Sequence, residues 1–153
     1  MISVQSEDFN LTDEYQLLRD ESVDAGAIVT FVGLVREFYD LQESKQGKIS
    51  GLTLEHYPGM TQKCLQDIVQ QAEARWQIQA ARVIHRIGEL KPQEQIVFVG
   101  TASAHRQDAF EAAQFIMDYL KSNAPFWKKQ HSESQSEWLN SKQSDEEALD
   151  RWS

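Results

Sequence analysis

Side chains that could bind an anion gather at three places in this 153-residue sequence. One is the pair His105 and Arg106, which follows an apolar run and opens a long amphipathic pattern. The free N–H groups at a helix N-terminus bind anions, and a His and an Arg there add donors for phosphate oxygens. The alternative is that both are solvent-exposed residues of a first helical turn, although cations there oppose the helix dipole.

A second group lies in the stretch KSNAPFWKK, where Lys121, Lys128 and Lys129 fall within nine residues. Lys121 ends the predicted helix, and Pro125 pushes the preceding residue out of the helical region. A lysine in a last helical turn can also simply complement the dipole, and the aromatic pair at 126–127 can be core or interface packing. In a chain of net charge −9, this local basic cluster predicts a small anionic ligand rather than a polyanion.

The third place is the end of the apolar run at 25–35, which predicts a buried strand interrupted by Gly33. This strand would deliver Arg36 to a polar, irregular segment at 36–51 that we interpret as a loop. A lone arginine at a strand end is commonly only a surface residue, so the functional interpretation depends on the other two groups.

The sequence gives little support for metal, cofactor or cysteine chemistry. Histidines, the cysteine and carboxylates do not cluster at zinc spacing, so we predict no metal and no cofactor. Cys64 lies on the apolar side of a predicted helix, which favours a buried, inert thiol. His56 and His85 each fall within a predicted strand and are interpreted as structural histidines.

The composition bounds the class of protein. Hydrophobic residues make up 41% and charged residues 25%, which is ordinary for one soluble domain spanning residues 1–153. The sequence has neither the run of roughly 20 apolar residues that a membrane span needs nor a secretory signal. The acidic balance disfavours nucleic acid, and a cytosolic location is expected.

Hydrophobic periodicity predicts helices at 12–20, 60–76 and 105–123, with Thr12, Thr61 and Ser103 as N-caps. A further short helix is expected within 138–149. Strands are predicted at 25–35, 52–57, 81–87 and 95–101, the last two paired antiparallel. The expected fold is α+β, with a mainly antiparallel sheet packed against two long helices.

Several strings in this order resemble the large, catalytic subunit of molybdopterin synthase. They are LTLEHYPGM at 52–60, VIHRIGEL at 83–90, IVFVG at 96–100, SAHR at 103–106, FEAAQFIMDYLK at 110–121 and APFWKK at 124–129. The resemblance extends from about residue 26 to 152, and several of the strings are highly specific.

The resemblance implies an α/β hammerhead fold and a sulfurtransferase of molybdenum cofactor biosynthesis. The implied substrate is cyclic pyranopterin monophosphate (precursor Z), a pterin phosphate. The sulfur would come from the C-terminal Gly-Gly thiocarboxylate of a small ubiquitin-like partner subunit, within a heterotetramer built around a homodimer of large subunits.

The resemblance also implies residue roles. Its catalytic lysines fall on Lys121 and Lys128. Its substrate-binding positions comprise both lysines together with Leu34, Val35, Arg36, His105, Arg106, Lys129 and Gln130. Many relatives carry a lysine where this chain has Leu34, so one basic group is missing unless that position contributes only backbone.

His105 and Lys121 are 16 residues apart on one predicted helix, which is about 24 Å at 1.5 Å per residue. One small substrate cannot touch both in a single chain, so we expect a site shared between two subunits. Two alternatives to the synthase are a non-catalytic module that binds a ubiquitin-like tail and a thioester hydrolase. For the hydrolase, the sequence offers no acid–nucleophile pair.

Overall fold

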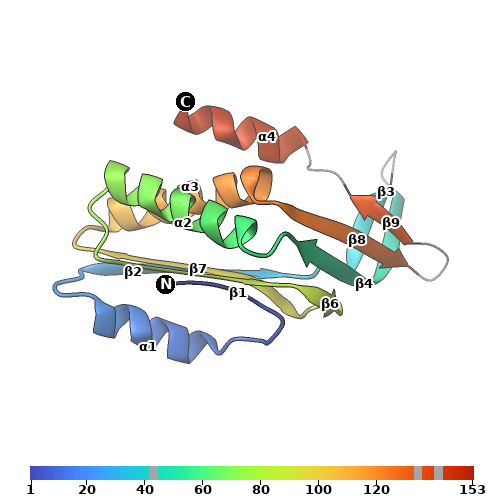
Figure 1. The fold of residues 1–153 in the computed structure, drawn as a ribbon, viewed down its shortest axis with the longest axis horizontal. Coiled ribbons are helices and arrows are strands. Elements are labelled where there is room, and N and C mark those ends of the chain that lie inside the picture. The colour runs from blue at the N-terminus through green and yellow to red at the C-terminus, as the bar shows by residue number, and fades with distance from the viewer. Residues whose placement is uncertain (42–44, 133–135, 140–142) are drawn as a thin grey trace.

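The protein, described here by a computed structural model, has two β-sheets and two helical layers (Figure 1). The structure describes residues 1–41, 45–132, 136–139 and 143–153. The first sheet has the strand order β1 (Ile2–Gln5), β5 (Ala80–Arg86), β7 (Gln95–Ser103) and β2 (Ala27–Leu34). Only its β1–β5 pair is parallel. The predicted α+β class with a mainly antiparallel sheet is confirmed, as is the antiparallel pairing of the two central strands.

The second sheet has the order β3 (Phe38–Leu41), β4 (Lys45–His56), β8 (Phe126–Ser132) and β9 (Ser136–Leu139), and the short strand β6 (Gly88–Leu90) also pairs with β4. The helices are α1 (Leu11–Glu21), α2 (Met60–Arg75), α3 (Arg106–Asn123) and α4 (Gln143–Leu149), followed by a 3-10 turn at Asp150–Trp152. The short tail helix is therefore confirmed.

The first sheet is covered on both faces. Helices α2 and α3 lie over one face and α1 over the other (Figure 1). Val83 and Val99 pack toward α2 and α3 with Phe115, whereas Ile84 and Phe98 pack in the α1 layer. Every residue of β5, in the middle of the sheet, is buried. The edge strand β2, which was predicted to be buried, has only half-buried and exposed residues, so that part of the prediction was wrong.

The predicted helix caps were wrong in position. Asn10, rather than Thr12, caps α1 by accepting a hydrogen bond from the Asp13 N–H at 3.1 Å. The N-cap of α2 is Gly59, whose φ of 80° suits glycine. Two of the hydroxyls predicted as caps, those of Thr61 and Ser103, instead donate to backbone carbonyls of distant segments.

The prediction of an irregular loop at 36–51 was also wrong, because β3 and the first half of β4 pair there as antiparallel strands. The strand β8 was not predicted either. It lies between β4 and β9, so partners distant in sequence determine it.

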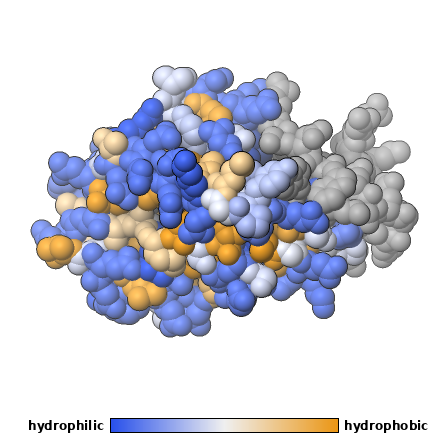
Figure 2. Space-filling view, in the orientation of Figure 1, coloured by the Kyte–Doolittle hydropathy of each residue, from blue (hydrophilic) through white to orange (hydrophobic). Residues whose placement is uncertain are grey.

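The face of the molecule in Figure 2 is mostly hydrophilic, with apolar residues gathered between the α1 and α2 layers, where β1 forms the edge of the sheet. Within the described ranges, no helix combines the length and apolarity that crossing a membrane would require.

Candidate functional site

The two lysines of the predicted catalytic pair lie on different elements that meet at one corner of the fold. Lys121 is exposed in the last turn of α3. Lys128 is half-buried in β8, in register with Leu54 of β4 and Leu139 of β9. The chain leaves α3 after Asn123 and enters β8 directly, so a short turn separates the two cations.

Beneath them lies His85, only 3% exposed in the last part of β5. Its ring stacks on Phe126 with the ring centroids 3.9 Å apart and an interplanar angle of 20°. Burial lowers the pKa of His85 to about 3, against a hydrogen bond to the Arg86 backbone that raises it. The positive charges of Lys128, Lys121 and His56 lower this pKa further, so all three groups act on the same buried ring.

The turn between the lysines is held from α2. The Thr61 hydroxyl, fully buried, donates to the Pro125 carbonyl at 3.3 Å. The Cys64 thiol donates to the Asn123 carbonyl at 3.5 Å. The backbone itself closes the turn, with the Phe126 N–H donating to the Ala124 carbonyl at 2.8 Å. These hydrogen bonds to the carbonyls of residues 123–125 fix the backbone that connects Lys121 to Lys128.

Cys64 is half-buried rather than fully buried, which corrects the sequence prediction. Burial, and then the nearby Asp67 carboxylate, raise the pKa of its thiol. A thiol of raised pKa is a poor nucleophile near neutral pH. The Cys64 thiol is therefore still expected to be inert, because of its raised pKa rather than because of full burial.

Arg36 lies at the same end of the first sheet as Lys121. Strand β2 ends at Leu34, opposite Gln95 at the start of β7, and α3 runs back over the sheet after β7, so its C-terminus returns to this end. Arg36 is exposed, as is Leu34, whereas Val35 is 1% exposed and anchored by its backbone to Gln93 and Glu94. The register of β2 on β7 shifts between Gly33 and Leu34, where the sequence predicted an interruption of the strand at Gly33.

His105 and Arg106 lie at the opposite end of α3. His105 is its N-cap residue and Arg106 its first residue, both exposed. The Ser103 hydroxyl, predicted to cap this helix, instead donates to the Gln77 carbonyl at 2.7 Å. Strand β2 begins nearby, and the Gly26 N–H donates to the Ser103 carbonyl at 2.9 Å. The structure therefore places the elements that carry Lys121, Lys128 and Arg36 toward one end of the first sheet, and His105 and Arg106 at the opposite end of α3.

Lys129 and Gln130 continue β8, opposite Thr53 and Leu52 of β4. Their side chains lie outside what the structure describes, so the prediction that they bind substrate stays a prediction.

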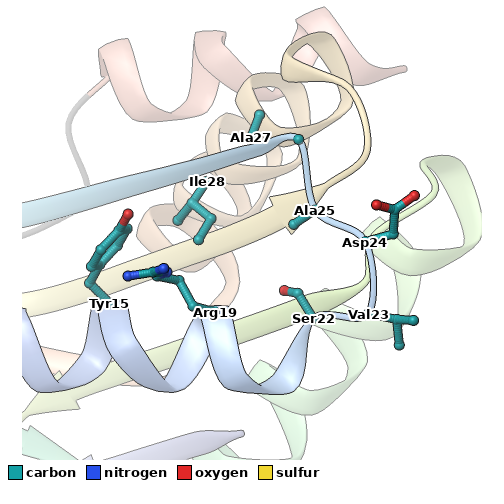
Figure 3. A pocket seen from close by; sticks show the side chains of 9 residues that line it. Tyr15, Arg19, Ser22, Val23, Asp24, Ala25, Ala27 and Ile28 are labelled. Carbon is teal, nitrogen blue, oxygen red and sulfur yellow. The ribbon is translucent and has the colours of Figure 1, made fainter.

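One depression in the surface lies away from the lysines, between α1 and the start of β2 (Figure 3). Tyr15 and Arg19 reach into it from the helix and Ile28 from the strand, with Asp24 at the connecting loop. Among the described residues that line it, none belongs to the predicted set. The candidate site therefore remains a prediction for the corner at Lys121 and Lys128.

Sequence reasoning missed the layer beneath the lysines. His85 and Phe126 lie 41 residues apart in sequence but stack face to face. The available signal was a histidine inside a strand whose neighbours are all apolar or arginine, which indicates a buried ring with a specific partner.

Solved structures share this arrangement of sheets and helices. The molybdopterin biosynthesis MoaE protein from Burkholderia ambifaria MC40-6 superposes with a TM-score of 0.83 at 41% identity, covering 99% of this chain and 97% of that one. A complex of subunits 1 and 2 of molybdopterin-converting factor from Helicobacter pylori 26695 gives a TM-score of 0.72 over 91% of this chain and 90% of that one. At 18% identity, the second likeness concerns the fold alone. The fold is thus that of the molybdopterin biosynthesis proteins.

Sequence comparisons identify the family within this class of proteins. Residues 4–123 match the model of the family described as MoaE protein. The molybdopterin synthase catalytic subunit of Vibrio cholerae serotype O1 is 51% identical over 151 residues, which are 99% of this chain and 97% of that protein. The chain therefore belongs to the MoaE protein family and is an enzyme of molybdenum cofactor biosynthesis, similar to molybdopterin synthase catalytic subunits.

Proposed function

We propose that this enzyme transfers sulfur from the C-terminal thiocarboxylate of a small ubiquitin-like subunit to precursor Z, forming the dithiolene of molybdopterin. The observation that carries the proposal is the convergence of Lys121 and Lys128 from α3 and β8 over one buried ring. Two cations held at one corner can bind an anionic substrate and an anionic tail together. The relatives named above are catalytic subunits, which implies a second subunit.

The chemistry needs a group that stabilises negative charge on oxygen. Each of two thiocarboxylate tails, in turn, delivers one sulfur. The sulfur bonds to a side-chain carbon of the pterin phosphate as an oxygen substituent leaves that carbon, as water or as a phosphate oxygen, and the tail is then joined to the pterin as an acyl thioester. Water attacks the acyl carbon, and collapse of the tetrahedral oxyanion leaves the sulfur on the pterin and a carboxylate on the tail. We assign the donor to this oxyanion, and the associated proton transfer, to Lys121. Lys128 binds the tail carboxyl and the substrate.

The substrate phosphate is assigned to Arg36, His105 and Arg106, whose donors suit phosphate oxygens. Arg36 lies at the lysine end of the first sheet, whereas His105 and Arg106 lie about 24 Å from Lys121 along α3. We therefore propose a composite site in which His105 and Arg106 come from the second large subunit of a homodimer within the heterotetramer. We place the reaction in the cytosol, a compartment suited to a protein with one free cysteine.

The competing function is a module that binds the ubiquitin-like tail without catalysis. Its basis is the same pair of cations, which could hold a C-terminal carboxylate and do nothing more. It differs from the synthase in one respect: Lys121→Ala would weaken binding of the tail without any turnover to lose.

The deciding experiment converts precursor Z with thiocarboxylated small subunit and quantifies dithiolene product for wild type and Lys121→Ala. We expect product from wild type and a loss of at least a hundredfold in kcat for the variant, because an oxyanion donor is removed. Lys63→Ala, at an exposed lysine of α2, serves as the matched control and should behave as wild type.

If neither wild type nor variant forms product while the small subunit still binds, the tail-binding module is correct. An unchanged kcat for Lys121→Ala would instead remove that lysine from the chemistry.

A further inference from the structure

The buried ring of His85 has fixed hydrogen bonding. Its Nδ1 lies 2.8 Å from the Arg86 carbonyl oxygen, and a carbonyl only accepts, so Nδ1 must carry the proton. The neutral ring then has an unprotonated Nε2. The orientation of the ring is thus set by the backbone of β5, at the centre of the first sheet.

The partner of this ring, Phe126, lies between the two lysines along the chain. Phe126 is the first residue of β8, two positions before Lys128, and follows the turn that ends α3 after Lys121. Its ring lies flat on His85 with the centroids 3.9 Å apart. On the other side, Phe126 is in register with His56 of β4. The start of β8 is therefore held both by its pairing with β4 and by a stacking contact with β5.

We propose that His85 is a positioning residue of the sulfur-transfer site, because its flat, neutral ring is the platform that places Phe126 and thereby sets the separation of Lys121 and Lys128. This inference rests on the proposed function for the role of the lysines, whereas the placement itself is a property of the fold.

The chemistry of the ring suits this role. An imidazole can stack as an aromatic ring does, and in its neutral form it adds no charge beneath two lysines. Burial and the neighbouring cations, Lys128 and Lys121 at the corner and His56 on β4, all keep the pKa of His85 low. An aliphatic side chain of similar volume would fill the space but would leave Phe126 without a flat ring on which to stack.

The test compares His85→Leu, which removes the platform, with His85→Phe, which restores a flat neutral ring. We expect His85→Leu to lower kcat for dithiolene formation by about tenfold or more, because small displacements of positioned groups are costly to catalysis. The KM values for precursor Z and for the small subunit should change by less than about threefold, since the charges remain. His85→Phe should recover kcat to within about threefold of wild type.

Val83→Ala provides the matched control, because Val83 is buried in the same strand and on the same face. It should lower thermal stability as His85→Leu does while leaving kcat unchanged. The inference is overturned if His85→Leu retains its kcat, if His85→Phe is as impaired as His85→Leu, or if Val83→Ala loses kcat equally.

A crystal structure of His85→Leu separates this inference from the proposed function. If wild type makes no product, the proposed function fails, but a displaced Phe126 and an altered distance between the Lys121 and Lys128 Nζ atoms would still support positioning. An unmoved Phe126 would contradict positioning whatever the activity.

Discussion

At the scale of single residues, His85 is a basic side chain buried where two lysines converge. The free energy of burying a charged imidazole there is prohibitive, so the folded protein keeps the ring neutral down to a pKa of about 3. The unfolded chain binds its proton near the ordinary value of 6.5. Between these two values the unfolded state holds more protons than the folded state.

This difference predicts how stability depends on pH. The contribution of His85 is complete above pH 6.5 and is lost progressively as the pH falls toward 3, by up to about 1.4 kcal/mol per pH unit. Between pH 6.5 and 4.5, wild type should lose about 2 to 3 kcal/mol more unfolding free energy than His85→Phe. Urea unfolding of both proteins at a series of pH values measures the difference.

His85→Phe also leaves the Arg86 carbonyl without its side-chain donor, which lowers stability at every pH and does not alter the slope. The comparison therefore uses slopes rather than absolute values. If the unfolding free energies of wild type and His85→Phe fell with the same slope between pH 6.5 and 4.5, His85 would not be buried as a neutral ring.

At the scale of elements, the turn between α3 and β8 depends on a hydroxyl from α2. Thr61→Val keeps the shape of the side chain but leaves the Pro125 carbonyl without its donor. We expect a loss of about 1 to 2 kcal/mol in unfolding free energy, because the donor is fully buried. We also expect kcat to fall severalfold, since this turn joins the two lysines. Urea unfolding and steady-state kinetics of the variant test both effects.

Ser22→Ala is the control for this prediction. The Ser22 hydroxyl also donates to a backbone carbonyl, that of Leu18 at 2.6 Å, but it lies at the end of α1 on the other face of the sheet. It should lose stability without losing kcat. Equal effects of the two variants on kcat would mean that the turn between α3 and β8 has no specific role in catalysis.

Elements with strong local patterns were predictable from the sequence. The stripes of α2 and α3 and the apolar runs of β5 and β7 carry their own signals, and all four were found within a few residues. The strand β8 was missed because FWKKQHS has no apolar alternation and is held in place by β4 and β9. The cap at Thr61 was misread because its hydroxyl contacts Pro125, 64 residues away.

The same distinction applies to the site. The cations Lys121, Lys128 and Arg36 could be named from residue type and spacing, and the structure brings their elements to one end of the first sheet. The platform of His85 and Phe126 could not, because stacking between distant segments leaves no local pattern.

At the scale of the whole molecule, the length of α3 decides how the site can be assembled. The helix is continuous from Arg106 to Asn123, so His105 and Lys121 stay about 24 Å apart at 1.5 Å per residue. A pterin phosphate cannot span that distance, and bending an 18-residue helix packed on a sheet would break its buried contacts. If all these cations serve one substrate, two chains must contribute them.

Mixed dimers test this assembly. A His105→Ala/Arg106→Ala double variant and a Lys121→Ala variant should each be inactive as pure proteins, the first through loss of phosphate binding and the second through loss of chemistry. When the two are unfolded together and refolded as a mixture, a dimer of one chain of each contains one site with all of its residues intact. With random pairing, half of the dimers are mixed and have one of two sites restored, so activity should recover to about one quarter of wild type. If each site were built within one chain, every site in the mixture would carry a defect, and the mixture would be as inactive as its components.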